Sequence, residues 1–257
     1  MLRILAVESA TDWLSVALLE GEEIVGLKAP SATRQHAGTL LPTIDALLSE
    51  AGWSLSGIDA LGISTGPGSF TSLRIGLATV KGLAFGREFQ AVGVSTLEAM
   101  ALSCLDSGGA GGASPDKEDE VVALLDARRG EWYAGAWSSA AEPGGVMTVA
   151  AAEGLYSPEA LAADLPRPVR VICPEPGDWA AEFASAGLGI ASRVEGEEAR
   201  PRADWVGRLA ARQLAAGEGI APEALTARYL RRAEAEAKRL GGPVEAGEIA
   251  RVEDSAQ

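Results

Sequence analysis

One glycine-rich stretch, residues 64–76, constrains the fold of this 257-residue chain more than any other. It reads Ser-Thr-Gly-Pro-Gly-Ser-Phe-Thr-Ser-Leu-Arg-Ile-Gly, after an apolar run and before a helical pattern, which predicts a strand, a tight loop and a helix. The free N–H groups of a first helical turn can bind phosphate. The loop lacks the Walker lysine and the third glycine of the dinucleotide pattern, so its spacing favours a structural turn, with Thr71 or Ser72 capping the helix.

Strand and helix patterns alternate along the chain, and the second half repeats the plan of the first. Short strands joined by tight turns begin both halves, which predicts an α/β chain of two related halves. The expected strands are 2–7, 14–19, 24–27, 58–63, 90–94, 121–125, 132–137 and 169–173. The expected helices are 40–51, 71–86, 95–104, a short one starting at 158, 179–186 and 203–216.

Two segments interrupt this pattern and suggest the domain limits. Residues 107–119 are rich in glycine, which is typical of a flexible loop. Residues 234–257 are charged and aperiodic, and we expect them to be disordered. The sequence therefore predicts an N-terminal lobe over 1–106, a loop over 107–119, a C-terminal lobe over 120–233 and a tail over 234–257.

Charge and cysteine content narrow the classes of function. The formal net charge is −14, with 36 acidic and 22 basic residues, whereas a chain that binds nucleic acid alone usually presents a basic face. Cys104 and Cys173 lack metal-type spacing, and we expect buried, reduced thiols. No signal peptide is visible, and no apolar run reaches the roughly 20 residues of a membrane span, so we expect a cytoplasmic protein without membrane contact.

The predicted helix 71–86 has two uncharged faces. One face carries Leu73, Leu77, Val80 and Ala84, and the other carries the smaller set Ile75, Ala78, Thr79, Gly82 and Gly86. A surface helix normally has one apolar face, so we expect the second to meet another helix, either the chain's own segment 40–51, a partner protein, or both. The predicted partner-binding residues are Leu40, Leu41, Ile44, Leu73, Ile75, Ala78, Thr79 and Gly82.

Few residues have the arrangement of a catalytic or metal site. His36 is the only histidine, and one histidine without a second ligand does not make a zinc or iron site, so we expect no metal. Asp126, Arg128 and Glu131 surround one predicted turn. They could bind a ligand, or form a hairpin that pairs its own charges.

Residues 66–76 resemble the Gly-Pro-Gly-Ser-Phe-Thr-Gly-hydrophobic-Arg-hydrophobic-Gly signature of the TsaB (YeaZ) family, with Ser72 in place of the usual glycine. Other blocks are similar to the family over residues 1 to about 232, in order. They are 1–17, Arg34-Gln35-His36 with Leu40-Leu41-Pro42, 94–97, 126–133 and Tyr229-Leu230-Arg231.

The resemblance implies a two-lobed actin/hexokinase/Hsp70-like fold with a mixed sheet and flanking helices in each lobe. It also implies a non-catalytic scaffold in the complex that transfers a threonylcarbamoyl group to adenosine 37 of tRNAs reading ANN codons. The implied partners are a TsaD-like catalytic subunit and a TsaE-like ATPase, with tRNA reached only through the complex. The free chain could also form a homodimer.

In actin-like enzymes, the position of the turn 8–12 holds a phosphate loop with an aspartate, where this chain has the longer Glu8. A polar hairpin turn, in which Thr11 and Asp12 bond their own backbone, is the favoured explanation of these residues. No cofactor is expected, except possible ATP at an interface of the full complex. The candidate residues of a degenerate nucleotide site or cleft are Glu8, Thr11, Gly66, Gly68, Ser69, Asp126, Arg128 and Glu131.

Two other functions stay open at this point. The chain could be an enzyme in its own right, an ATP-dependent actin-like phosphotransferase or a peptidase. It could also be a homodimeric binding protein without a role in tRNA modification. Titration with Mg-ATP separates an enzyme from a scaffold, and mass measurement with and without a TsaD-like protein separates the other two.

Overall fold

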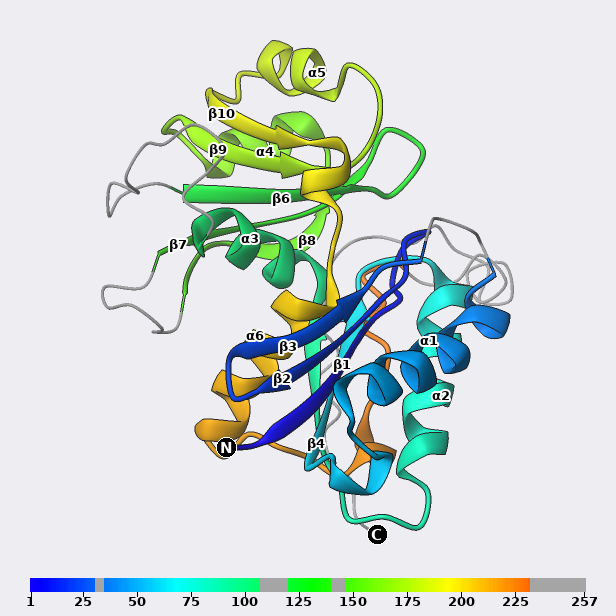
Figure 1. The fold of residues 1–257 in the computed structure, drawn as a ribbon. Coiled ribbons are helices and arrows are strands. Elements are labelled where there is room, and N and C mark those ends of the chain that lie inside the picture. Colours follow the sequence, from blue (N-terminus) through cyan, green and yellow to red (C-terminus); the bar gives the residue numbers. More distant parts are fainter. Residues whose placement is uncertain (31–34, 107–119, 140–146, 232–257) are drawn as a thin grey trace, which may run out of the picture.

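The computed structural model describes residues 1–30, 35–106, 120–139 and 147–231, and it contains two five-stranded mixed sheets with helices against their faces (Figure 1). The predicted loop 107–119 and tail 234–257 lie outside the described residues. The expected two-lobed α/β architecture is confirmed. Among the described residues, no helix combines the length and apolarity needed to cross a membrane.

The first sheet has the strand order β3-β2-β1-β4-β5. Strands β1, β2 and β3, which the expected tight turns join, form an antiparallel meander, and β4 and β5 extend it in parallel. Side chains along β1 point alternately to the two faces of the sheet, so Leu5 and Val7 pack in one hydrophobic cluster and Ile4 and Ala6 pack in another. The bounds are β1 Arg3–Glu8, β2 Ser15–Glu20, β3 Glu23–Lys28, β4 Ala60–Gly66 and β5 Gln90–Ser95.

The second sheet repeats the first strand for strand, with the order β8-β7-β6-β9-β10. Its first three strands are antiparallel and its last two are parallel, as in the first sheet. The predicted repetition of the plan is therefore confirmed. The bounds are β6 Glu120–Asp126, β7 Trp132–Ser138, β8 Thr148–Tyr156, β9 Val169–Cys173 and β10 Ile190–Glu195.

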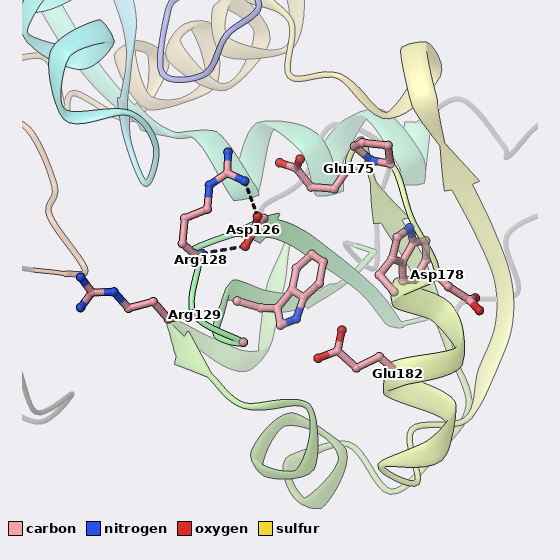
Figure 2. A pocket seen from close by; sticks show the side chains of 10 residues that line it. Asp126, Arg128, Arg129, Glu175, Asp178 and Glu182 are labelled. Carbon is pink, nitrogen blue, oxygen red and sulfur yellow. Dashed lines mark hydrogen bonds and ion pairs between the residues drawn. The ribbon is translucent and has the colours of Figure 1, made fainter.

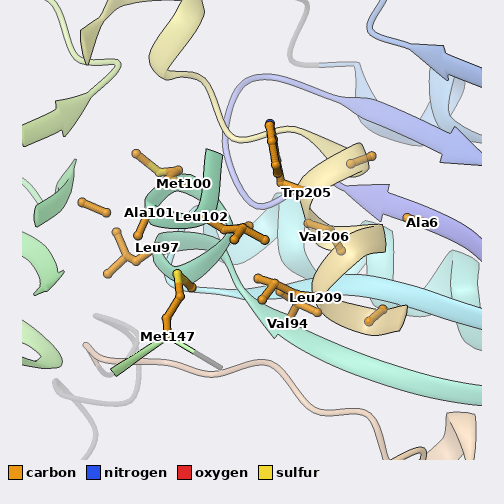
Figure 3. Close-up of a cluster of buried hydrophobic side chains, with 14 of the residues drawn as sticks. Ala6, Val94, Leu97, Met100, Ala101, Leu102, Met147, Trp205, Val206 and Leu209 are labelled. Atoms are coloured by element: carbon orange, nitrogen blue, oxygen red, sulfur yellow. The ribbon is translucent and has the colours of Figure 1, made fainter. Parts of the chain in front are cut away.

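Six α-helices of the described residues cover the sheets. Helices α1 and α2 cover one face of the first sheet, and α4 and α5 cover the outer face of the second. Helices α3 and α6 lie between the sheets and share one large core (Figure 3). The bounds are α1 His36–Ala51, α2 Phe70–Ala84, α3 Thr96–Asp106, α4 Pro158–Asp164, α5 Trp179–Ser185 and α6 Ala203–Ala215, with short 3-10 turns at 55–57, 196–199 and 222–224.

The two central helices do not follow the order of the chain. Helix α3 packs on β6 and β7 of the second sheet, whereas α6, from the end of the chain, packs on β1, β2 and β4 of the first. The lobe limits predicted at 106 and 120 follow the order of the sequence and stay a prediction. Because Leu97 and Met100 of α3 share a core with Val206 and Leu209 of α6, the two halves are joined by apolar packing (Figure 3).

The expected elements match the described ones closely, with three differences. Strands β8 and β10 were not predicted, because β8 is rich in alanine, glycine and glutamate and β10 alternates weakly. Ser69, rather than Thr71 or Ser72, caps α2. The helix expected over 40–51 already begins at His36, whose side chain is buried. The cysteines are free and buried, as expected, and burial raises the pKa of Cys173 to about 12.

Candidate functional site

The glycine loop joins β4 to α2 as predicted, but protein atoms already occupy the start of the helix. The Ser69 hydroxyl accepts a hydrogen bond from the backbone N–H of Ser72 (3.4 Å), and the Ser69 N–H donates to the carbonyl of Ala10 (2.6 Å). A Cβ atom on Gly68 would lie 2.1 Å from that carbonyl oxygen, so glycine is required there. A phosphate at this helix end would first have to displace the turn that contains Ala10.

That turn begins at Glu8, whose side chain is enclosed by the protein. Glu8 is 0% exposed, and its carboxylate accepts a hydrogen bond from the backbone N–H of Ala10 (2.6 Å). Burial raises the pKa of Glu8 to about 7, although the hydrogen bonds from Ala10 and Ser64 oppose this shift. The prediction that Glu8 is a cleft residue therefore needs correction, because an enclosed carboxyl group cannot hold a metal-bound water in the cleft.

Thr11 stabilises its own turn, as the hairpin interpretation predicted. Its hydroxyl accepts a hydrogen bond from the backbone N–H of Trp13 (3.3 Å), as expected for a polar side chain that stabilises its own turn. Thr11 also lines a cleft, together with Gly68 and Ser69. These three predicted residues are therefore close together, while Glu8 lies behind them in the core.

The cleft has a volume of about 530 Å³ and is lined from both halves of the chain. It carries three carboxylates, of Asp12, Asp126 and Glu175, and one guanidinium group, of Arg128, which pairs with Asp126 at 2.9 Å. Burial raises the pKa of Glu175, and the charges of Asp126 and Asp12 act in the same direction. An excess of carboxylates disfavours nucleotide phosphates at this place.

A second hollow, of about 500 Å³, adjoins the cleft at the carboxyl ends of β6 and β9 (Figure 2). Trp132 and Trp179 contribute apolar lining, and Asp178 and Glu182 add negative charge to the shared Asp126 and Glu175. The carboxyl ends of parallel strands are the usual position of ligand sites in α/β sheets. The lining also contains Arg128 and Arg129, so its four carboxylates leave a net negative charge, as in the cleft.

The β6–β7 turn carries Asp126, Arg128 and Glu131, which the sequence predicts together. Asp126 accepts hydrogen bonds from the backbone N–H of Arg128 (2.6 Å) and from its guanidinium group (2.9 Å), so this part pairs its own charges (Figure 2). Arg128 and Arg129 have φ of 68° and 64°, in the left-handed region that non-glycine residues rarely adopt.

Glu131 does not join that pair. It forms an ion pair with Arg231, which also donates to the carbonyl of Ala127 at 2.5 Å. No local pattern placed Arg231 here, since 100 residues separate it from Glu131. Its only signal was its position in the block Tyr229-Leu230-Arg231.

The second face predicted for α2 is accessible in the described structure. Ala78 and Gly82 are exposed, Ile75 and Thr79 are half-buried, and a Cβ atom on Gly82 would meet no atom within 4 Å. Phe85, just after the helix, is 85% exposed. We call the surface of Ile75, Ala78, Thr79, Gly82 and Phe85 the α2 surface. Helix α1 lies beside α2 and shares a core with Leu77, Val80 and Ala84 of its other face (Figure 1), so whether the second face meets a partner stays a prediction.

Part of the predicted partner-binding set needs correction. Leu40 and Ile44 are only 1% and 3% exposed, because they belong to the core under α1 and α2. Leu73 is 0% exposed on the buried side of α2. They support the helices but present no surface to a partner. Leu41, in contrast, is 50% exposed on α1 and remains a candidate contact.

The geometry offers little for a metal. His36 is 2% exposed in the core. Within the described ranges, no three or more His, Cys, Asp or Glu side chains are grouped in a way that could hold an ion.

Comparison with known proteins gives a consistent set of relatives. The family model described as TsaD, tRNA N6-adenosine threonylcarbamoyltransferase, matches residues 22–236. The chain is 40% identical over 132 residues to the tRNA threonylcarbamoyladenosine biosynthesis protein TsaB of Escherichia coli, covering 51% of this chain and 53% of that protein. The chain thus spans about half the length of the curated relatives it matches.

Solved structures extend the similarity to most of the fold. YeaZ from Pseudomonas aeruginosa matches with a TM-score of 0.69 and 29% identity, covering 90% of this chain and 100% of that one. A structure described as an uncharacterized protein with similarity to peptidase YeaZ, from Pseudomonas aeruginosa, matches with a TM-score of 0.70 and 30% identity over the same shares. The chain therefore belongs to the TsaD family of this model and, within it, to the TsaB (YeaZ) type.

Proposed function

We propose that this chain is a non-catalytic scaffold subunit in the formation of threonylcarbamoyladenosine at adenosine 37 of tRNAs that read ANN codons. In this proposal it binds a TsaD-like catalytic subunit in the cytoplasm and helps to recruit a TsaE-like ATPase. The family membership and the names of its TsaB relatives support this assignment.

The closed start of α2 is the observation that carries the non-catalytic role. A phosphate bound at a helix start needs free N–H groups, but at the start of α2 the Ser69 N–H donates to the Ala10 carbonyl and the Ser72 N–H donates to the Ser69 hydroxyl. In the turn 8–12, where actin-like enzymes place a phosphate loop, the Glu8 carboxyl group is buried. The acidic cleft beside it would also repel a nucleotide. In isothermal titration with Mg-ATP, we expect no stoichiometric heat, whereas binding followed by turnover would support the alternative of an independent phosphotransferase.

The α2 surface is the proposed contact for the TsaD-like partner. Small residues such as Ala78 and Gly82 let the backbone of a partner helix approach closely, and the exposed Phe85 adds an apolar anchor. The same surface could accept a second copy of the chain when the partner is absent. Mass measurement of the chain alone and with the partner distinguishes these assemblies.

The charge of the chain supports indirect contact with tRNA. A net charge of −14 opposes the approach of a polyanion, so the basic surface that binds tRNA belongs, in this proposal, to a partner. Gel-shift titration should show tRNA binding by the complex and none by this chain alone at the same salt concentration.

Gly82→Arg tests the partner surface. Arginine is a better helix former than glycine, by roughly 1 kcal/mol, and Gly82 has open space around it, so the isolated chain should melt at or above the wild-type temperature. Partner binding should collapse, because a long charged side chain would be buried without a counter-charge. Circular dichroism and a pull-down with the TsaD-like protein measure the two effects.

Two control variants isolate the cause. Gly82→Ala keeps the surface small while removing the glycine, and should bind normally. Ala181→Arg adds the same charge to the exposed side of α5 and should also bind normally. Full binding by a folded Gly82→Arg variant would show that the interface lies elsewhere.

A further inference from the structure

The last described segment, residues 220–231, runs from the first sheet to the second, and we call it the strap (Figure 1, orange). Its start is attached to the first half. Ile220 and Ala91 exchange two backbone hydrogen bonds, of 2.8 and 2.9 Å, which cover the edge of β5. Leu225 is 2% exposed and belongs to the core under α1 and α2.

The middle of the strap crosses the glycine loop. The Arg228 N–H donates to the carbonyl of Thr65, at the end of β4, at 2.7 Å. A Cβ atom on Gly66 would lie 2.8 Å from the Arg228 carbonyl oxygen, and Gly66 has φ of +114°. Glycine at this position thus accommodates the strap, a role distinct from the phosphate contact expected from the loop pattern.

The strap also contacts α2 directly. The ring of Tyr229 lies 5.1 Å from that of Phe70, and its hydroxyl accepts a hydrogen bond from Arg74 at 3.3 Å. The guanidinium group of Arg74 stacks 3.7 Å from the Phe70 ring centre. Two turns further along, Lys81 donates to the carbonyl of Glu223 at 2.9 Å. These contacts flank the α2 surface.

The end of the strap reaches the second half through two arginines. Arg228 pairs with Glu153 of β8 at 3.0 Å, and the Glu153 side chain is only 8% exposed. Arg231 pairs with Glu131 and donates to the carbonyl of Ala127, in the β6–β7 turn. The charge-assisted hydrogen bonds of Arg231 are directional, and they fix the position of this turn.

We propose that the strap is a detachable brace that fixes the two sheets relative to each other and links the α2 surface to the cleft. Apolar and backbone contacts hold its start, whereas ion pairs hold its end, so the end at Arg231 is the part that releases first. Release would free the turn containing Ala127 and Arg128, which line the cleft.

Distances between spin labels on the full chain test the brace. Labels on Ser49→Cys in α1 and Ala184→Cys in α5 report on the two halves, because both positions are exposed and both native cysteines are buried. The otherwise unchanged chain should give one narrow distance distribution. Arg231→Ala should add a second distance or broaden the first. The variant should still be folded at the temperature of labelling, as its melting curve would show.

Arg193→Ala is the matched control, since Arg193 pairs with Glu195 inside β10 and leaves the strap untouched. Glu131→Gln removes the same ion pair from the other side while preserving side-chain size, and it decides the question if Arg231→Ala fails to fold. Unchanged distances in the folded strap variants, or equal broadening in Arg193→Ala, would overturn the brace.

Hydrogen exchange tests the link to α2. If the strap is one coupled unit, Glu131→Gln should accelerate amide exchange at the start of α2, residues 70–74, although the substituted residue lies in the other half. The control Arg193→Ala should leave this exchange unchanged. Faster exchange confined to the β6–β7 turn would overturn the coupling.

Discussion

Replacement of the buried Glu8 by glutamine should change how the stability of the protein depends on pH. Glu8 is completely buried, and its pKa in the folded protein is about 7, against an ordinary value of 4.5. This difference corresponds to about 3 kcal/mol, because each pKa unit is worth about 1.36 kcal/mol.

The sign follows from the number of bound protons. Below pH 4.5 the carboxyl group is protonated in the folded and the unfolded chain, so it contributes no pH dependence. Between pH 4.5 and about 7 the folded chain holds a proton that the unfolded chain has lost, so stability falls as the pH rises. Above about pH 7 the full loss has accumulated, because the folded chain must then bury a charged carboxylate.

Glu8→Gln removes this titration. The amide oxygen of the new side chain can still accept the hydrogen bond from the Ala10 N–H. The amide NH2 group needs a new acceptor, and this lowers the stability of the variant by an amount that does not change with pH. The free energy of unfolding of the variant minus that of the wild type should therefore rise by up to about 3 kcal/mol between pH 5 and pH 8.

Urea unfolding followed by tryptophan fluorescence at pH 5, 6, 7 and 8 measures this difference. Burial also raises the pKa of Glu98 and of Glu153, but both carboxyl groups are present in the wild type and in the variant, so their effects on stability cancel. Glu182→Gln, on the exposed side of α5, is the control for exchanging a carboxylate for an amide. A difference between Glu8→Gln and wild type that stays constant over this range would refute the buried, protonated Glu8.

Four further predictions test the description of the fold and the site. Gly68→Ala should lower the free energy of unfolding by about 1–3 kcal/mol in urea titration, because its Cβ would collide with a carbonyl oxygen 2.1 Å away. Leu40→Ala should cost about 2–5 kcal/mol in the same assay, and the exposed Leu41→Ala about 0.5 kcal/mol or less; equal costs would contradict their assigned burial. A chain ending after Arg231 should keep its melting temperature, whereas one ending after Ala227 should melt earlier, since it loses the ionic end of the strap. Elemental analysis of the purified chain should find no stoichiometric zinc or iron, and one metal ion per chain would contradict the assignment of a site without metal.

The α2 surface shows which part of a predicted interface helical periodicity can identify. Counting residues along the helix separated a core face, with Leu73 and Val80, from a small second face, with Ala78 and Gly82. The same counting could not tell which residues of a face are exposed. The packing on the first sheet removed Leu73 and, on α1, Leu40 and Ile44 from the possible contacts.

Local pattern was enough to predict most of the elements and the repeated plan of the two halves, because apolar alternation and helical periodicity are properties of neighbouring residues. It failed for β8 and β10, the two edge strands of the second sheet, whose sequences have weak strand preference. Each becomes a strand because one neighbouring strand, β7 or β9, offers it a row of hydrogen bonds.

The sites depended far more on tertiary structure than the elements did. The sequence by itself predicted a glycine turn, a charged hairpin and an isolated histidine, because these are local features. Only the folded chain determined that the Ala10 carbonyl closes the start of α2 and that Arg231 binds the hairpin from 100 residues away. Contacts between distant residues depend on how the two sheets and the strap pack, and no spacing along the chain encodes them.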